Sequence, residues 1–287
     1  MHILNFSTLL LAALVVVSAL TKGKDPAEKT SVLLLDASTF PKVIPHHNLS
    51  TLVMIAPRAD EGDYGLLSLK QDFWAFAEQA EFTAKSESVR FAQLLVDQPI
   101  PQGIAGEATT KLINRIDKEY LQSIQPRLYL FRPNSAVAEM YPRFSSVNVI
   151  SLSRWLSQRT PFYMGTSGTI YEFYVLARKL MLEAMESTDS VQLRADILAR
   201  TKSYVESLGK TAPEELMEMA NYYLKTIERV IERGAGYVLP ELNRLEDLVS
   251  GTDVKLSNEK KQSLQKRINV LYNFVFVKPE SLKIDEL

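Results

Sequence analysis

The strongest constraint on the fold is a change of pattern near residue 160. Residues 31–160 alternate short runs rich in β-branched and aromatic residues with helical stretches, which predicts an α/β domain built on a largely parallel sheet. Residues 169–277 lack such runs and repeat apolar residues at helical spacing, which predicts an all-helical domain. Residues 161–168 are rich in Gly, Ser, Thr and Pro and are predicted to be the linker.

The first domain is predicted to contain five strands and four helices in the order βαβαβαββα, which is the order of a thioredoxin fold. The predicted strands are Val32–Leu35, Leu52–Ala56, Val89–Val96, Arg127–Phe131 and Ala136–Tyr141. The predicted helices are Ser38–Ile44, Leu69–Lys85, Glu107–Tyr120 and Val149–Gln158.

One proline supports this order. Pro126 stands directly before the apolar strand Arg127–Phe131, and proline is usually found at the first position of a strand because it cannot donate to the sheet. Thioredoxin-like domains carry a cis-proline at this place, so we predict a cis-proline at Pro126. The alternative is a trans proline that only begins the strand, since about 5–6% of X-Pro bonds are cis.

The second domain is predicted to contain five helices. Three buried helical faces begin at Ile170, Leu216 and Leu264, and Val191–Leu208 and Tyr237–Val249 form two further helices. Glycines at 209, 234 and 251 stand where helices would end.

The chain has no cysteine, which excludes disulfides, thiolate catalysis and zinc bound by cysteine. Residues 56–65, where a thioredoxin fold carries its active thiols, are polar and charged. The adjacent His46 and His47 do not suit a shared metal, and no phosphate loop or nucleophile elbow is present. We therefore predict no enzyme activity, no metal and no cofactor.

Charge gives no preference for a polyanionic partner. Lys plus Arg number 33 and Asp plus Glu number 34, so the sequence favours neither nucleic acid nor an anionic membrane.

Both ends of the chain carry address signals. Residues 1–19 contain an apolar run followed by a small-residue cleavage site and are predicted to be a signal peptide cut after Ala19. The tail, residues 278–287, ends in Ile284-Asp285-Glu286-Leu287, a variant of the retention signal that a receptor reads in the endoplasmic reticulum. No stretch reaches the roughly 20 apolar residues of a bilayer span. We predict a protein of the endoplasmic reticulum lumen that is not inserted in the membrane.

Asn48-Leu49-Ser50 is an N-glycosylation sequon in a predicted surface loop, so Asn48 is a candidate modification site.

A colinear set of short motifs resembles one family over nearly the whole mature chain: the redox-inactive, thioredoxin-like proteins of the endoplasmic reticulum that include endoplasmic reticulum protein 29 and Windbeutel. The set comprises Leu35-Asp36-Ala37-Ser38-Thr39-Phe40, Lys42-Val43-Ile44-Pro45, Tyr64-Gly65, Lys70-Gln71-Asp72, Pro126 with Tyr129-Leu130-Phe131, Arg154-Trp155-Leu156 and Tyr163-Met164-Gly165.

The resemblance implies a homodimer that escorts secretory client proteins without catalysis. It places Asp36 at the dimer interface, although Asp36 also suits an ordinary helix N-cap. It makes Tyr64 and Gln71 part of a peptide-binding surface. The family's other tyrosine has no counterpart, about two residues are inserted before Lys70, and Thr169 replaces the linker cysteine of mammalian members. The alternative function is a structural adaptor that holds other folding factors through its helical domain.

Overall fold

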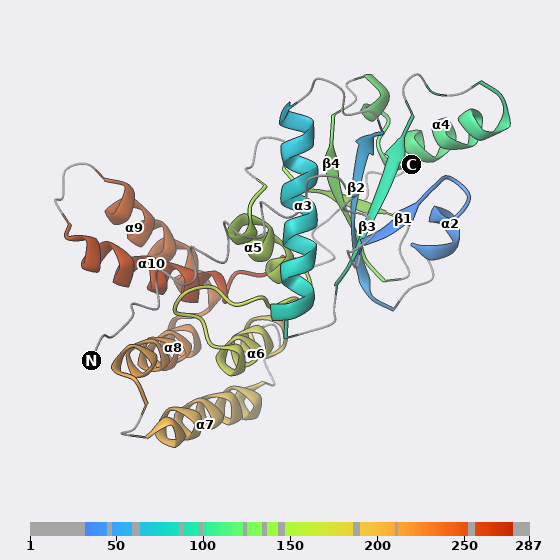
Figure 1. Cartoon of the computed structure of the whole chain (residues 1–287). Coiled ribbons are helices and arrows are strands. Elements are labelled where there is room, and N and C mark those ends of the chain that lie inside the picture. The colour runs from blue at the N-terminus through green and yellow to red at the C-terminus, as the bar shows by residue number, and fades with distance from the viewer. Residues whose placement is uncertain are drawn as a thin grey trace. The chain divides into compact units, whose positions relative to one another are not determined.

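The structure is a computed structural model. It describes residues 32–44, 48–58, 64–85, 89–97, 100, 102–122, 125–133, 137–142, 147–185, 190–209, 212–251 and 256–277, with the side chains of 64–67 excepted. The chain divides into two compact units (Figure 1). The first comprises Met1–Glu81 with Arg90–Met140, and the second comprises Phe82–Val89 with Tyr141–Leu287. The predicted signal peptide and the predicted retention residues lie outside the described residues.

The first eight predicted elements occur in the first unit in the predicted order, and the ninth, the helix α5 (Val149–Arg159), belongs to the second unit. Its strands are β1 (Val32–Leu35), β2 (Ser50–Pro57), β3 (Val89–Val96), β4 (Arg127–Phe131) and β5 (Ala138–Met140). Its helices are α2 (Phe40–Val43), α3 (Tyr64–Thr83) and α4 (Ile104–Ile116), with a 3₁₀ turn at Tyr120–Gln122. The strands form one sheet in the order β1-β3-β2-β4-β5. The thioredoxin-like α/β fold is confirmed.

The sheet is mixed, so the expectation of a largely parallel sheet is wrong. β1 and β3 are parallel, whereas β4 pairs antiparallel with both β2 and β5. A parallel pair needs a crossover of a dozen or more residues, and the short connection from Phe131 to Ala138 permits only an antiparallel return.

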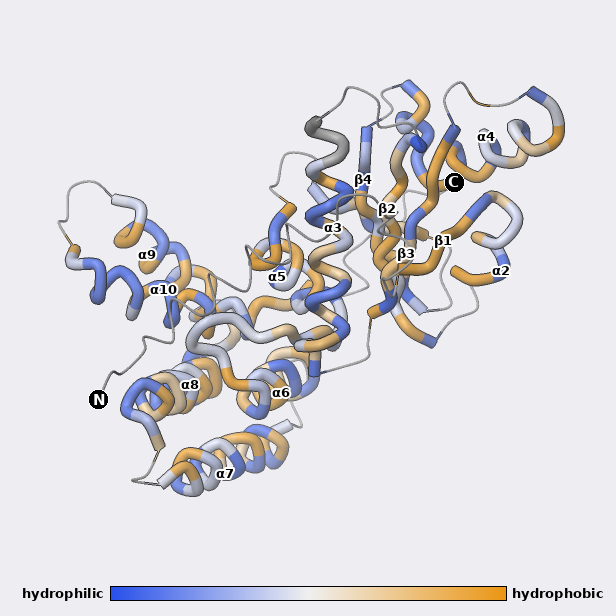
Figure 2. The backbone as a smooth tube through the Cα atoms, viewed as in Figure 1, coloured by the Kyte–Doolittle hydropathy of each residue, from blue (hydrophilic) through white to orange (hydrophobic). Residues whose placement is uncertain are grey.

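Helices cover both faces of this sheet. Val53 and Ile55 of β2 share a buried cluster with Phe40 at the start of α2 and Ile113 of α4. On the other face, Phe91 lies 6.2 Å from Phe73 and 5.7 Å from Phe76 of α3, measured between ring centroids. The central strand β2 is buried at every position, and its middle residues Leu52–Ala56 are all apolar, as the orange colour of hydrophobic residues in Figure 2 indicates.

The second unit contains α5 (Val149–Arg159), α6 (Tyr171–Lys179), α7 (Val191–Leu208), α8 (Glu214–Arg233), α9 (Val238–Ser250) and α10 (Asn258–Tyr272). Within the described residues after position 170 there are thus five α-helices, as predicted. α6 continues into a π-helical turn at Leu180–Ala184, and a 3₁₀ turn, Ala235–Tyr237, precedes α9.

Apolar spacing explains this helical core. In α8 the buried Met219, Tyr223, Ile227 and Val230 recur every three or four residues and therefore form one face. Glu214 and Glu215 occupy the first turn of α8, where the helix dipole favours negative charge.

Residues 161–168, the predicted linker, are packed within the second unit. Phe162, Tyr163 and Met164 are 1%, 6% and 7% exposed. Tyr174 Oη donates to the Phe162 carbonyl at 3.1 Å, so α6 holds this segment from one side. Phe162–Met164 are therefore buried in the second unit, whereas Pro161, Gly165 and Ser167 are exposed.

Across the described residues, no helix combines the length and the apolar character that crossing a bilayer requires.

Candidate functional site

The carboxyl ends of β2 and β3 lie together and are joined by Arg58. The backbone N–H of Arg58 donates to the Val96 carbonyl at 2.8 Å, and its guanidinium pairs with Asp97. β1 runs parallel to β3 and β4 runs antiparallel to β2, so Asp36 and Pro126 lie at the same end of the sheet. We call this end, marked by Asp36, Arg58, Asp97 and Pro126, the carboxyl edge.

Lys70 anchors α3 to the carboxyl edge. Its side chain is buried, with only 2% of the residue exposed, and Nζ donates to the Pro57 carbonyl at 2.8 Å. The ammonium thus binds the last carbonyl of β2, which lies within residues 56–65, the segment where the fold would carry thiols. The sequence placed Lys70 only within a family motif. Its position three residues before the buried Phe73, on the apolar face, was the available signal.

A buried ion pair lies beside Pro126. Arg127, the first residue of β4, donates to the carboxylate of Asp117, which follows α4. Tyr129 Oη also donates to this carboxylate, at 2.6 Å, and the Arg127 guanidinium lies 5.3 Å from the ring centroid of Tyr120. Burial by itself raises the pKa of Asp117, but hydrogen bonds from Tyr129, the Glu119 backbone and Arg127 offset this and hold the pKa below its ordinary value.

Asp36 forms a local cap at the carboxyl edge. Its Oδ1 accepts hydrogen bonds from the N–H and hydroxyl groups of Ser38 and Thr39 at 2.8–2.9 Å. The Ser38 hydroxyl, followed by the other three donors, lowers the pKa of Asp36 from 3.8 to about 2. Phe40 N–H then donates to the Asp36 carbonyl at 2.9 Å. The carboxylate thus closes the turn before α2, whose own N-cap residue is Thr39. The dimer role predicted for Asp36 stays a prediction.

Tyr64 and Gln71 lie on one helix. The sequence predicted the helix from Leu69, but α3 begins at Tyr64, so that boundary was wrong. Seven residues correspond to about two turns, so the two positions share a face of α3. Gln71 is exposed, and the side chain of Tyr64 lies outside the described residues.

Other predicted sites are distributed along the chain. Pro126 is half-buried and directly precedes β4, as expected, and its cis bond stays a prediction. Asn48 is exposed at the opposite end of the sheet. In the part of the chain that the structure describes, no group of three or more metal-binding side chains occurs, and His46 and His47 lie outside that part.

Charged side chains at the carboxyl edge are hydrogen-bonded within the chain. Asp117 is occupied by Arg127 and Tyr129, and Lys70 by the Pro57 carbonyl. No sulfur nucleophile is available, because the chain has no cysteine.

Comparison with known proteins identifies the helical part. Residues 168–274 match the model of the family described as "Endoplasmic reticulum protein ERp29, C-terminal domain". The helical domain of this chain is therefore similar to the C-terminal domain of the ERp29 family. The resemblance found in the sequence is confirmed for these residues.

Two further likenesses are weaker. The chain is 29% identical over 85 residues to "Protein disulfide-isomerase 1" of Dictyostelium discoideum, which is 30% of this chain and 22% of that relative. The chain thus spans about a fifth of the length of the relative it matches. Two crystal structures of ERdj5, of the full-length protein and of form I, each match at a TM-score of 0.30 and 10% identity. The matches cover 63% and 70% of this chain and 24% of each ERdj5 chain. We draw no conclusion about fold or function from a TM-score this low.

The ERp29-type helices are joined to α5 by a polar network. Arg154 of α5 donates to Asn269 Oδ1 at 2.6 Å and lies 4.1 Å from the ring centroid of Tyr272, both on α10. Arg178 of α6 donates to the Thr160 carbonyl at 2.9 Å, just beyond the end of α5. The Arg178 hydrogen bond satisfies a carbonyl at a helix end that would otherwise lack an intrahelical partner.

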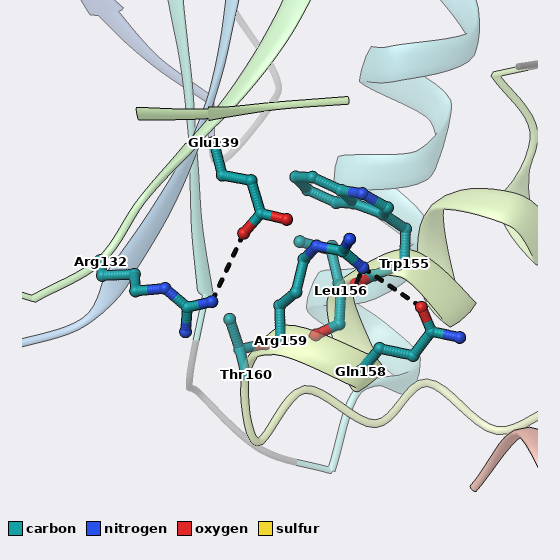
Figure 3. A network of polar contacts seen from close by, with 7 residues as sticks. All are labelled: Arg132, Glu139, Trp155, Leu156, Gln158, Arg159 and Thr160. Carbon is teal, nitrogen blue, oxygen red and sulfur yellow. Dashed lines mark hydrogen bonds and ion pairs between the residues drawn. The ribbon is translucent and has the colours of Figure 1, made fainter. Parts of the chain in front are cut away.

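Figure 3 shows two local polar contacts, one in each unit. In the first, Arg132, which follows β4, pairs with Glu139 of β5 at 3.4 Å. In the second, Arg159 lies 4.6 Å from the Trp155 ring centroid and donates to Gln158 Oε1 at 3.2 Å. Both contacts are intramolecular and stabilise their own elements.

Proposed function

We propose that this chain is a non-catalytic escort or chaperone of the endoplasmic reticulum lumen that binds secretory proteins as a homodimer. The observation that carries the proposal is an ERp29 C-terminal domain following a thioredoxin-like sheet in a chain without cysteine. The sheet supplies a binding edge, and the missing sulfur removes the redox chemistry that such an edge otherwise supports. Binding without turnover is the function that this combination favours.

The family and the relative support the compartment. The family is one of the endoplasmic reticulum, and the relative is a protein disulfide-isomerase, so a folding-related role in that organelle is the common element. Residues 1–19 would direct entry, and Ile284, Asp285, Glu286 and Leu287 would engage the retention receptor.

The client surface in this proposal is the exposed face of α3 that carries Tyr64 and Gln71. A tyrosine offers a rigid apolar face with a polar tip, and a glutamine amide both donates and accepts, which suits an unfolded chain of mixed sequence. Lys70 fixes the amino end of α3 to the last carbonyl of β2, so this face is held at the carboxyl edge.

The dimer contact in this proposal centres on Asp36 and β1. β1 is an edge strand of the sheet, and its Leu33 and Leu34 are 40% and 58% exposed, three and two residues before Asp36. Exposed leucines on an edge strand favour burial by another chain. Sedimentation of Asp36→Asn beside the wild type tests this role, and an unchanged dimer would remove Asp36 from it.

Affinity capture from secretory cells tests the client surface. We expect Tyr64→Ala and Gln71→Ala to lose captured secretory proteins that the wild type retains. Gln79→Ala is the matched control, because it removes the same amide from an exposed position two turns further along α3. Equal partner sets for all four proteins would show that the proposed surface is wrong.

A second candidate is a structural adaptor, which the family match of the helical domain favours because it is the recognised part of the chain. Crosslinking in the lumen separates the two functions. Unfolded cargo captured through the thioredoxin-like unit supports the escort, whereas stable capture of resident chaperones through the helical domain supports the adaptor.

A further inference from the structure

The sequence contains two glycosylation sequons, and one of them falls in the predicted signal peptide. Asn5-Phe6-Ser7 would be removed with residues 1–19, which leaves Asn48-Leu49-Ser50 as the single acceptor of the mature chain. A single acceptor gives a simple assay, because occupied and unoccupied chains differ by one glycan.

The two essential residues of this sequon differ in exposure. Asn48 is exposed in the connection between α2 and β2, so the folded protein has room for a sugar at its amide. Ser50 is 5% exposed and is the first residue of β2. β2 lies between β3 and β4, and Thr51 pairs with Phe131 immediately after Ser50. Folding therefore covers the serine while it leaves the asparagine open.

The position of Asn48 is compatible with the proposed function. β2 rises about 3.3 Å per residue, so its eight residues separate Asn48 from Arg58 by more than roughly 20 Å. Asp36 and the start of α3 lie at the carboxyl edge, and Asn48 lies at the other end of the sheet. A glycan at Asn48 therefore leaves both the client surface and the dimer contact open.

We propose that Asn48 carries an N-linked glycan and that the glycan is transferred before β2 enters the sheet. This rests on the proposed function, since the donor is a lipid-pyrophosphate-linked oligosaccharide of the lumen. Asn48 Nδ2 forms a bond to the anomeric carbon of the first sugar and loses one proton, and the lipid pyrophosphate leaves with the electron pair of the broken bond. The transferring enzyme must contact the Ser50 hydroxyl, which the folded sheet covers.

Translation of the full chain into microsomes tests the acceptor. We expect a deglycosylation-sensitive mass shift of one glycan for the wild type and for Ser50→Thr, and no shift for Asn48→Gln or Ser50→Ala. Asn258→Gln is the control, because it replaces an exposed asparagine outside any sequon and should retain the shift.

Donor depletion tests the order of events. Chains synthesised in donor-depleted microsomes and then supplied with donor should stay unmodified, because Ser50 is covered once the sheet has formed. Addition of a glycan to these completed chains would overturn the proposed order.

Protease protection and signal cleavage distinguish the two proposals. A protease-protected chain with a cleaved signal peptide but no mass shift would overturn the proposed glycosylation and would leave the proposed function unaffected. A chain that stays outside the microsome overturns both.

Discussion

Gly168 joins the segment before α6 to α10. Its φ is +84°, and a Cβ at this position would lie 2.6 Å from Lys266 Cβ. Nearby, Asn269 Nδ2 donates to the Ser167 carbonyl at 2.9 Å, so the two backbones approach closely at this point. The sequence identified this glycine only as part of a linker.

We expect Gly168→Ala to destabilise the helical unit by about 2–5 kcal/mol. A left-handed alanine costs about 1–2 kcal/mol, and the clash with Lys266 adds about 1–3 kcal/mol of overpacking. Gly165→Ala is the control, since its φ is also positive, +75°, while its nearest neighbour would lie at 3.6 Å. Urea unfolding followed by circular dichroism measures both, and equal losses would contradict a close approach at Gly168.

Asp36 should make stability depend on acid pH. Because its pKa is lowered from 3.8 to about 2 in the folded chain, its contribution is complete above about pH 4 and is lost as the pH falls toward 2. The stability difference between wild type and Asp36→Asn should therefore shrink over this interval, as measured by thermal unfolding. A difference that stays constant down to pH 2 would show that the carboxylate is not held by Ser38 and Thr39.

At the scale of elements, the buried ion pair fixes the end of α4 to the start of β4. The side chains of Arg127 and Asp117 are 7% and 12% exposed, so each charge depends on the other for compensation. Sequence alone could not pair them, because both are charged residues beside turns and their burial depends on how α4 packs on the sheet.

We expect Arg127→Met to destabilise the thioredoxin-like unit by about 3–5 kcal/mol, because it leaves the Asp117 carboxylate buried without its cation. The double variant Arg127→Met/Asp117→Asn should recover part of this loss, since no net charge is then buried. Urea denaturation of the two variants and of Asp117→Asn completes a double-mutant cycle. Strictly additive losses would show that the pair is not coupled.

The π-helical turn after α6 is a feature that the apolar periodicity of the sequence does not predict. Met185 N–H donates to the Leu180 carbonyl, five residues back, and the Ala184 carbonyl accepts from Arg194 Nε at 3.0 Å and from Ser190. The apolar spacing of this stretch fits a continuous α-helix. The extra residue in the turn is instead stabilised by side chains at the start of α7, which local sequence does not reveal.

At the scale of the molecule, α5 groups with the helices that follow it. Arg154 reaches α10, Arg178 binds the carbonyls of Ser157 and Thr160, and Val277 N–H donates to the Gln158 carbonyl. The predicted boundary after residue 160 was placed on composition, and composition does not report these hydrogen bonds.

Native-state hydrogen exchange tests this grouping. We expect the amides of α5 to open with those of α6 and α10 as denaturant is added, because the same hydrogen bonds hold all three. Arg178→Met, which removes donors to the end of α5, should lower protection in its last turn, and exposed Arg200→Met on α7 is the control. If α5 opened with β2 and β4 instead, the grouping would be wrong.

The sequence by itself determined the order of elements, the number of helices and the loss of thiol chemistry. Each of these depends on local spacing or on whether a residue type is present, and none of them requires contacts between residues distant in sequence. Only the tertiary structure decided the mixed pairing of the sheet, the burial of Lys70 and of Arg127 with Asp117, and the contact of Gly168 with α10. These features depend on which residues, distant in sequence, are buried together and touch one another. These contacts form only when the chain has packed.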